Sequence, residues 1–547
     1  MNKSTKPSSG AGVAMAWQKL NPATGELLAT YQATPSAELD HQVICAYDAF
    51  QHWQQSGLKR RQQLLNRFAE LLLEHLDALA TCITAEVGKP LHEAIQLDIM
   101  PAISHVQAIA KQGVAQYRPQ DLGMTLSSLM LGRHLQLHRL PHGVMGVISP
   151  WNYPIGLAAS ILANCLMAGN TVVFKPSERT PATGQALVEL WHQACQQVGV
   201  PTAVVQLVQG DGKQGSELVN HPLVQAVVFT GSDAVGRQIQ QVCASRNIPC
   251  VLELGGSDAG IILPSASALN MDTIVANVVW SRFSNAGQTC AAIKRLYVHD
   301  SLFPVVKELL LAKLLQLNVG DPTLPTTHMG PLIDQHQWQR CEAQRQDAID
   351  KGATVHQATL SSTACSEGYY MPPTLLFETH PDMRVRFEET FGPLLPIMVY
   401  QHVDDVIDEI NRLPYGLGAS VFGATHEAEA VARRLQVGQV GINHLAMLNN
   451  AFTQAPWLGW KCSGPGVRGG VLGMESFVKH QVQASVPRFT WPVLAQGKDM
   501  WLFGKSLHSF SFAKRLCSAL TAPQGWKELL HVEFYQGLWD QRPIAKL

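Results

Sequence analysis

The sequence predicts an α/β protein built around parallel sheets. From Gly143 onward, short runs rich in β-branched residues alternate with stretches of helical spacing. A second alternation of the same kind extends from Ala259 to about Gly473. Strands that alternate with helices form mainly parallel sheets with crossover helices. We therefore expect two α/β domains, the first with a sheet of Rossmann type.

The segment from Ala37 to Arg118 shows helical spacing, with charged residues opposite the apolar ones. Its periodic apolar residues are Leu64, Leu65, Phe68, Leu71, Leu72, Leu76 and Leu79. We expect helices here, ahead of the first sheet. The predicted strands of that sheet are 144–148, 171–174, 203–208, 226–229 and 250–254. The apolar run 155–169 contains Asn164 and is shorter than the roughly 20 residues that span a bilayer, so it predicts a buried helix.

Composition restricts the class of function. The 547 residues include 41 basic and 42 acidic ones, a net charge of -1 that predicts no nucleic-acid partner. The polar N-terminus does not resemble a signal peptide. Eleven cysteines without paired spacing indicate reduced thiols, and hence a cytoplasmic protein. The pairs His134/His138 and Cys243/Cys250 have no companion pair at zinc spacing, so we expect no metal.

One cysteine stands in a distinctive setting. Residues 284–290 read SNAGQTC, which places Cys290 among small residues that allow backbone amides and a ligand to come close. Residues 252–256 read LELGG, with Glu253 in an apolar run where burial would raise the pKa of its carboxyl. A thiol nucleophile and a poised base suggest acyl chemistry.

These two motifs, together with PWNYP at 150–154 and FTGS at 229–232, closely resemble those of the aldehyde dehydrogenase superfamily. The resemblance runs from about Leu20 to Val486, with the motifs in the family's order and at its spacings. It implies NAD(P)-dependent oxidation of an aldehyde to a carboxylic acid.

Aldehyde oxidation needs three kinds of catalytic group. Cys290 is the expected nucleophile, although a single cysteine taken alone is more often buried and inert. The resemblance assigns the oxyanion hole to Asn152 and the backbone N–H of Cys290; alone, Asn152 would be read as a turn residue. Glu253 is the expected base for hydrolysis of the thioester, the alternative being a salt-bridged structural carboxylate.

The cofactor is expected to be NAD, with NADP as the alternative. Gly210 to Gly215 form a literal GxGxxG, but in this family the phosphates are held by the next turn, so we expect the Gly210 loop to flank the adenine. Glu178 would accept ribose hydroxyls and repel a 2′-phosphate, whereas Lys175 favours the phosphate. The expected cofactor-binding residues are Ser149, Trp151, Lys175, Ser177, Glu178, Gly212, Gly231, Ser232, Glu389 and Phe391.

The expected domains follow the same resemblance. Residues 1–123 and 144–253 would form the NAD-binding domain and residues 254–475 the catalytic domain. Residues 124–143 and 476–488, which include stretches of period-two alternation, would form the strands of a small β domain for oligomerisation. We therefore expect a homodimer or homotetramer.

The C-terminal extension, 489–547, extends beyond most relatives and has no assigned role. It is rich in aromatic and basic residues and predicts an amphipathic helix near 506–521. Packing on its own or a partner subunit is the favoured interpretation, and peripheral contact with a membrane is the alternative.

Three residues depart from the common pattern. Ser257 and Asp258 stand where a lysine-containing sequence often follows the glycine pair, and Leu458 replaces a second glycine near the expected substrate entrance. Because no arginine pair can be placed there while Trp457, Leu458 and Trp460 are apolar, hydrophobic aldehydes are favoured. The alternatives are a semialdehyde-specific enzyme, a CoA-acylating enzyme or an inactive scaffold. The CoA-acylating branch does not need a base such as Glu253, which argues against it.

Overall fold

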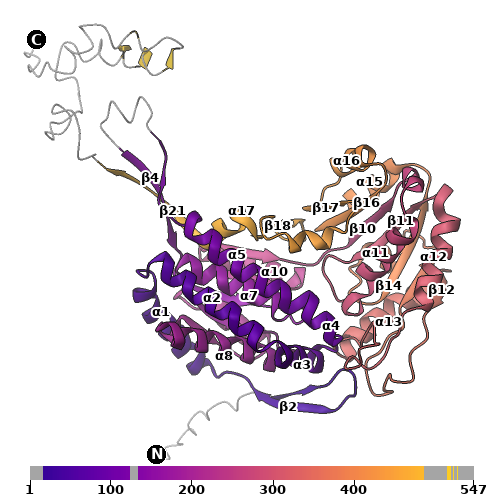
Figure 1. Ribbon diagram of the computed structural model, residues 1–547, viewed down its shortest axis with the longest axis horizontal. Coiled ribbons are helices and arrows are strands. Elements are labelled where there is room, and N and C mark those ends of the chain that lie inside the picture. Colours follow the sequence, from indigo (N-terminus) through magenta and orange to yellow (C-terminus); the bar gives the residue numbers. More distant parts are fainter. Residues whose placement is uncertain are drawn as a thin grey trace, which may run out of the picture. The chain divides into compact units, whose positions relative to one another are not determined.

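The computed structural model describes residues 16–123 and 134–485, and isolated residues between 514 and 527. The predicted helix at 506–521 and the rest of the extension therefore lie mostly outside the described residues. The chain divides into two compact units: Met1–Gln116 with Pro141–Lys479, and Tyr117–Leu140 with His480–Leu547. Figure 1 shows the elements that follow.

The chain begins with an antiparallel hairpin that the sequence did not predict, β1 (Ala16–Leu20) and β2 (Leu27–Gln32). The helices predicted next are confirmed: α1 (Ser36–Trp53), α2 (Leu58–Glu74), α3 (Leu76–Val87), α4 (Leu91–Glu93), the π-helical turn η1 (Ala94–Ile99) and α5 (Met100–Gln116). Their periodic leucines are mostly buried, and Phe68 stacks on Trp191 with ring centroids 3.6 Å apart. This stacking joins α2 to the helices of the first sheet.

The first sheet is parallel, with strand order β7-β6-β5-β8-β9. Its strands are β5 (Val144–Ile148), β6 (Thr171–Lys175), β7 (Val205–Leu207), β8 (Val224–Thr230) and β9 (Cys250–Glu253). Its helices are α7 (Gly156–Ala168), α8 (Pro181–Val198), α9 (Gly212–Asn220) and α10 (Asp233–Ser245). The predicted parallel sheet and the predicted buried helix are thereby confirmed. Strand order reverses between β5 and β8, the place where open α/β sheets bind ligands.

The predicted strand 203–208 is shorter than expected. Thr202–Val204 form a 3₁₀ turn instead, and β7 begins only at Val205. Pro201 precedes the turn, and its fixed φ suits the start of a helical turn better than a central strand.

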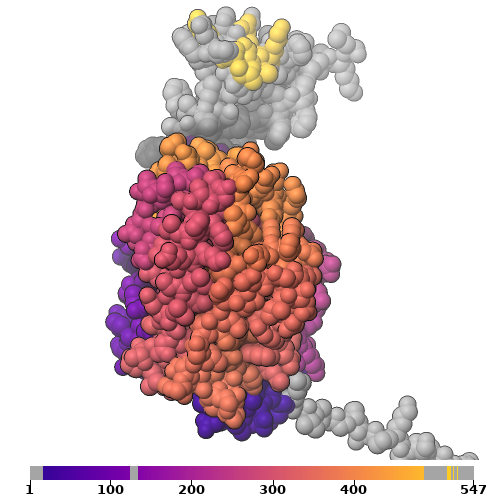
Figure 2. All heavy atoms as spheres, turned by 90° about the vertical axis from the view of Figure 1, so that its right-hand side faces the viewer, coloured from indigo at the N-terminus to yellow at the C-terminus, as the bar shows by residue number. Residues whose placement is uncertain are grey.

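The second sheet has the order β12-β13-β14-β11-β10-β16-β17 and is parallel except for β12. Its strands are β10 (Asp258–Ile262), β11 (Ile293–His299), β12 (Thr354–Gln357), β13 (Thr374–Phe377), β14 (Leu394–Tyr400), β16 (Gly418–Phe422) and β17 (Gln439–Ile442). Its helices are α11 (Met271–Phe283), α12 (Phe303–Leu315), α13 (Gln335–Asp350), α14 (Arg384–Phe387), α15 (Val403–Arg412) and α16 (Thr425–Ala432). Figure 2 looks onto this part of the chain, coloured magenta to orange.

Strands β10 and β11 are neighbours, and Asp258 pairs in register with Ile293. Glu253 and the glycine pair precede β10, and Cys290 precedes β11. Because the two strands are parallel, the segments that lead into them meet at the same edge of the sheet. This topology explains how two motifs far apart in the sequence share one place.

Shorter elements complete the description: β15 (Tyr415–Gly416) with β19 (Trp460–Lys461), β18 (Trp457–Leu458) with β20 (Val467–Arg468), and α17 (Gly470–Met474). A separate three-stranded sheet has the order β21-β4-β3, from β21 (Val478–Ser485), β4 (His134–Pro141) and β3 (Gln120–Asp121). Among the described residues, no helix is both long enough and apolar enough to cross a membrane.

Candidate active site

The loop that carries Cys290 follows α11 and adopts an unusual backbone. Asn285 and Ala286 both have φ of 52° and Gly287 has 75°, three consecutive residues in the left-handed region. This conformation is costly for residues other than glycine and persists only where the surroundings impose it. Glu93 supplies part of that support, since its Oε2 accepts a hydrogen bond from the backbone N–H of Asn285 at 2.8 Å.

The carboxyl of Glu93 is buried, which raises its pKa to about 7. Hydrogen bonds from Asn285 and Ser284 and the nearby charge of Lys89 act in the opposite direction. The support of the left-handed loop therefore depends on a group that titrates near neutral pH.

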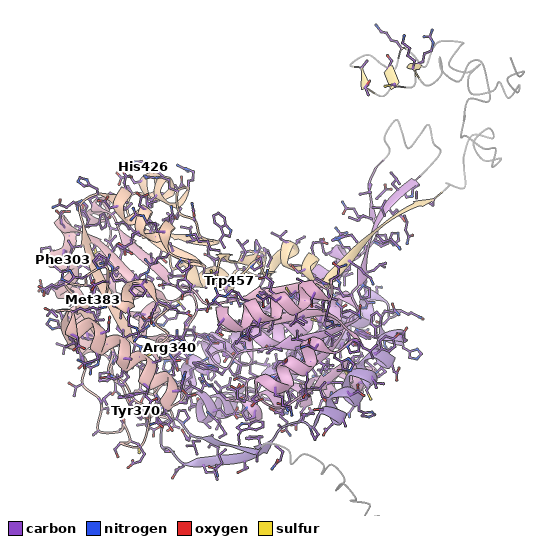
Figure 3. All side chains as sticks on the ribbon, turned by 180° about the vertical axis from the view of Figure 1, so that it is seen from behind. Phe303, Arg340, Tyr370, Met383, His426 and Trp457 are labelled. Carbon is purple, nitrogen blue, oxygen red and sulfur yellow. The ribbon has the colours of Figure 1, made fainter. Side chains whose placement is uncertain are left out.

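Cys290, the expected nucleophile, is partly exposed. Burial of its thiol raises the pKa to about 11, while Lys294 and Arg468 lower it and Glu389 and Asp258 raise it. An apolar cluster of Ala291, Leu417 and Trp457 packs beside it. Figure 3 labels Trp457, which is buried, whereas Leu458 is half-buried and Trp460 is exposed.

Asn152 lies between β5 and α7 and is buried. Its side-chain Nδ2 donates to the carbonyl of Gln288 at 3.0 Å, which brings the amide to within two residues of Cys290 in the sequence. The backbone carbonyl of Asn152 accepts hydrogen bonds from Lys89 Nζ at 2.8 Å and from Asn285 Nδ2 at 3.1 Å. The two segments expected to form the oxyanion hole are therefore tied directly to each other.

A buried ion pair lies behind this junction, between Lys89 Nζ and Asp98 Oδ2 at 3.1 Å. Asp98 Oδ1 accepts the backbone N–H groups of Ile155 and Gly156, where α7 begins. Lys89 Nζ also lies 3.9 Å from the ring centre of Tyr153. The sequence did not predict a role for Lys89 or Asp98. Their only mark in the sequence is that they are ionisable residues within a largely apolar helical segment.

Glu253 ends β9 and is buried. Burial raises the pKa of its carboxyl, as the sequence predicted, and Arg468 lowers it. Arg468 Nε lies 2.6 Å from Glu253 Oε1, so the carboxylate is ion-paired. Arg468 also affects the thiol of Cys290, and sequence reasoning did not identify it.

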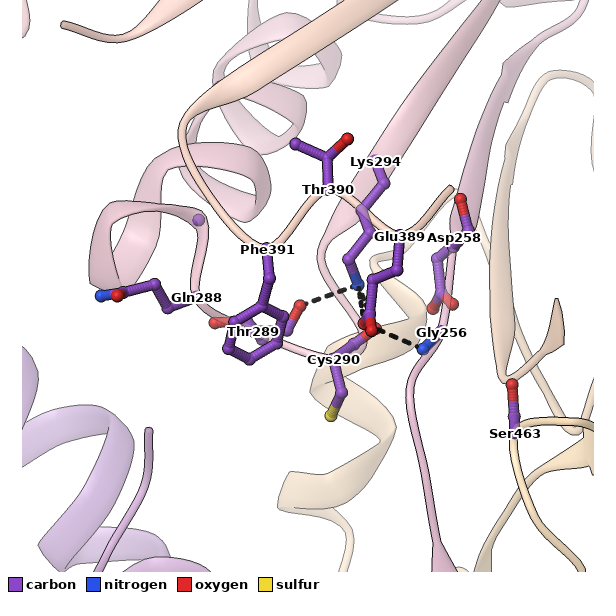
Figure 4. Close-up of polar contacts among 12 residues, drawn as sticks. Gly256, Asp258, Gln288, Thr289, Cys290, Lys294, Glu389, Thr390, Phe391 and Ser463 are labelled. Carbon is purple, nitrogen blue, oxygen red and sulfur yellow. Dashed lines mark hydrogen bonds and ion pairs between the residues drawn. The ribbon is translucent and has the colours of Figure 1, made fainter. Parts of the chain in front are cut away.

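The glycine pair after Glu253 allows close packing. A Cβ at Gly255 would collide with the carboxylate of Glu389, and one at Gly256 would lie 2.8 Å from the carbonyl oxygen of Cys290. Gly256 N–H donates to Glu389 Oε1 at 3.0 Å, as Figure 4 shows. The candidate ribose ligand Glu389 and the Cys290 loop thus meet at this pair.

Most of the other expected cofactor residues follow β5, β6 and β8, whereas Gly212 follows β7 and Phe391 precedes β14. Ser149 is buried, and its Oγ has no hydrogen-bond partner among the described residues. Trp151 makes an edge contact with Phe391 at 5.5 Å between ring centres. Lys175 is buried, which lowers the pKa of its ammonium, and Glu178 Oε2 lies 3.9 Å away and is more exposed. Ser177 accepts the backbone N–H of Arg179 through Oγ.

The two glycine turns differ in how their helices begin. At α9, which starts with Gly212, Asp211 and Gln214 form a capping box and occupy first-turn amides. At α10, Ser232 is the N-cap but makes no side-chain cap hydrogen bond. The start of α10, after Gly231, can therefore offer amides to a phosphate group, and the orphaned Ser149 Oγ and the Glu389 carboxylate offer partners for ribose and nicotinamide. These residues fit a nicotinamide dinucleotide.

The comparisons with known proteins agree with this geometry. The model of the aldehyde dehydrogenase family matches residues 11–482. The chain belongs to this family. A glutarate-semialdehyde dehydrogenase of Pseudomonas putida is 35% identical, over 84% of this chain and 92% of that protein. A succinate-semialdehyde dehydrogenase [NADP(+)] of Deinococcus radiodurans is 34% identical, over 90% of this chain and 99% of that protein.

Solved structures extend the likeness to the fold. The crystal structure of succinate-semialdehyde dehydrogenase from Burkholderia pseudomallei is similar to this chain with a TM-score of 0.80 and 31% identity. The similarity covers 86% of this chain and 95% of that one. As a member of the aldehyde dehydrogenase family the chain is an oxidoreductase of Rossmann-type α/β fold, as the sequence predicted.

Proposed function

We propose that this aldehyde dehydrogenase oxidises an aldehyde to a carboxylic acid through a covalent intermediate on Cys290. The hydrogen bond from Asn152 Nδ2 to the Gln288 carbonyl carries the proposal, because it brings a carboxamide beside the nucleophile loop. One N–H of that amide is used in this contact, which leaves the second to donate to a developing oxyanion.

In the first half of the reaction, the Cys290 thiolate attacks the carbonyl carbon and forms a C–S bond, and the carbonyl oxygen becomes an oxyanion. Asn152 and the Cys290 backbone N–H stabilise that charge. Bound NAD(P) would accept the hydride that leaves this carbon, and a thioester remains.

In the second half, Glu253 removes a proton from water, whose oxygen attacks the thioester carbon. The C–S bond breaks and releases the acid and the Cys290 thiolate, and Glu253 loses its proton to solvent. The ion pair with Arg468 supports the ionised form of Glu253, the form a base requires. An enzyme that passed the acyl group to CoA would not require this buried carboxylate.

We propose NAD(P) as the cofactor. Its proposed ligands are the start of α10, Ser149, Lys175, Ser177, Glu178, Glu389 and Phe391. Trp151 lies beside Phe391, and Gly212 would flank the adenine. The chemistry of these residues supports this proposal, as does the NADP(+) in the name of the Deinococcus relative. Glu178 favours NAD in this chain.

Two substrate classes follow from different observations. The apolar cluster with Trp457 favours a hydrophobic aldehyde. The relatives named succinate- and glutarate-semialdehyde dehydrogenase favour a semialdehyde that carries a carboxylate. Chain-matched pairs of neutral and carboxylated aldehydes, each tested with NAD and NADP, would decide by the ratio of kcat/KM.

We also propose that the chain forms a homo-oligomer through the sheet of β21, β4 and β3. β21 is an edge strand with seven consecutive exposed residues after Val478, and Val482 is 60% exposed. An open edge of this kind is a ready site for pairing with a second copy. Light scattering on the purified protein tests this, and a monomer would refute it.

A further inference from the structure

Lys294 is a buried lysine directly beneath the nucleophile. It lies in β11, and its side chain is 1% exposed. The sequence did not predict it as a site residue. Its Nζ donates to the carbonyl of Thr289 at 2.9 Å and to the carbonyl of Cys290 (Figure 4). The ammonium therefore holds the two peptide groups on either side of Cys290.

The same ammonium is 3.5 Å from Glu389 Oε1. That oxygen also accepts the N–H of Gly256, so Glu389 is shared between a charged and a neutral donor. A distance of 3.5 Å exceeds that of a good charge-assisted hydrogen bond, and the contact can be lengthened or shortened at modest cost. Glu389 is the carboxylate proposed above to contact the cofactor ribose.

A second carboxylate faces Lys294 from β10. Asp258 Oδ1 accepts the N–H of Gly418 at 3.0 Å, whereas Asp258 Oδ2 is buried and makes no hydrogen bond within the described part of the chain. Burial lowers the pKa of Lys294, and the charges of Glu389 and Asp258 raise it. The Lys294 ammonium thus offsets the charge of two carboxylates and donates hydrogen bonds to two backbone carbonyls.

This arrangement accounts for a departure seen in the sequence. Ser257 and Asp258 follow the glycine pair in place of a lysine-containing sequence, and Asp258 brings an acid where it would be buried. Arg295 donates to the Ser257 side chain and carbonyl, and Lys294 offsets the charge of Asp258. Of the two positive charges that act on Cys290, Lys294 belongs to β11 and Arg468 to β20.

We propose that Lys294 is a positioning residue that couples the ligand state of Glu389 to the reactivity of Cys290. The inference rests on the proposed function for the roles of Glu389 and Cys290. Hydroxyl groups that donate to the Glu389 carboxylate compete with Lys294 for the same oxygens. The ammonium is then less neutralised, and its field acts more strongly on the thiolate of Cys290. Engagement of Glu389 would therefore activate the nucleophile.

The test measures the thiol directly. Full-length protein is treated with iodoacetamide over a range of pH, with and without NAD, and alkylation of Cys290 is followed by peptide mass spectrometry. The charged groups that face this thiol are Lys294, Arg468, Glu389 and Asp258, so the unaltered protein sets the baseline for all four. Lys294→Met removes the charge, Lys294→Arg retains it, and Lys313→Met removes a partly exposed lysine that pairs with Asp272 elsewhere.

In Lys294→Met we expect cofactor-free alkylation at pH about 8 to be roughly ten-fold slower, the effect of about one unit in the thiol pKa. We also expect NAD to lose most of its accelerating effect. Lys294→Arg should restore at least part of the cofactor-free alkylation rate and part of the acceleration by NAD. Lys313→Met should match the unaltered protein in both quantities. Bound NAD shields the thiol equally in all variants, so the ratio of rates with and without NAD isolates the contribution of Lys294.

Glu389→Gln tests the coupling from the other side and should make alkylation insensitive to NAD while Lys294 remains. Equal rates and equal NAD effects in Lys294→Met and the unaltered protein would overturn the proposal, as would full NAD dependence in Glu389→Gln. Binding of NAD, followed by tryptophan fluorescence, shows that each variant is folded. Retained oxidation in Cys290→Ala would instead refute the proposed function, and the two failures are thus distinguishable.

Discussion

Glu253 Oε1 and Arg468 Nε lie 2.6 Å apart, and both side chains are about nine-tenths buried. A buried carboxyl alone would resist ionisation, and the guanidinium opposes that effect. The pair therefore makes the charged form of Glu253 available in a place where burial alone would withhold it.

Loss of the arginine charge should move the pH dependence of hydrolysis. In Arg468→Met the pKa of Glu253 rises further, because burial remains and the opposing charge is gone. A base must be ionised, so the acid limb of the pH–rate profile should move to higher pH, by about 1–3 units, with activity recovered above the new limb. Arg468→Lys should keep the limb near its original place. An unmoved limb in Arg468→Met would contradict this account.

The nucleophile and the base should separate in kinetics. Cys290→Ala should lower kcat by about four orders of magnitude or more while NAD still binds, because only a small thiol is lost. Glu253→Gln should instead give an initial burst of about one NADH per active site and then little turnover, since the thioester forms but is not hydrolysed. Full steady-state activity in Glu253→Gln would exclude its role as the base.

Cofactor preference should depend on Glu178. Its exposed carboxylate repels a 2′-phosphate, so the unaltered enzyme should use NAD with the higher kcat/KM. Glu178→Ser removes the repulsion and leaves Lys175. The ratio of kcat/KM with NAD to kcat/KM with NADP should therefore fall by about ten-fold. A preference of the unaltered enzyme for NADP would show that Lys175 dominates this turn.

The Lys89–Asp98 pair should matter for stability. Lys89→Met leaves the Asp98 carboxylate buried without its charge partner and should destabilise the protein by about 3–5 kcal/mol, seen as a lower urea midpoint. The double variant Lys89→Met/Asp98→Asn keeps an acceptor for the amides of Ile155 and Gly156 and should recover much of the loss. Equal midpoints for the single and double variants would argue against an unpaired charge as the cause.

Much of the fold could be predicted because it depends on local periodicity. The predicted strand 144–148 has the bounds of β5, and the predicted buried run 155–169 contains α7, whose residues from Leu157 to Ala168 are all buried. Cys290, Asn152 and Glu253 were predicted in another way, from short loop motifs that resemble those of the aldehyde dehydrogenase superfamily. Their roles and those of the cofactor residues stay predictions.

The charged residues behind the site could not be predicted. Lys89 and Arg468 act through contacts with segments distant in sequence, and Lys294 acts through the backbone carbonyls of Thr289 and Cys290. No periodic pattern marks such contacts. Lys89 meets Asn152 across 63 residues, and Arg468 meets Glu253 from a two-residue strand. Only the folded chain shows which acidic residue or carbonyl each of these basic side chains contacts.

Lys89 precedes α4 and Glu93, four residues later, ends it, yet Lys89 holds the Asn152 loop of the first sheet and Glu93 holds the Asn285 loop of the second. The segment 89–93 thus contacts both loops that form the proposed oxyanion hole. If the sheets shift against each other as ligands enter and leave, each loop can follow this shared anchor instead of its own sheet. The spacing between the Asn152 carboxamide and the Cys290 thiol would then be preserved, and an insertion or deletion within residues 89–98 would misalign both at once.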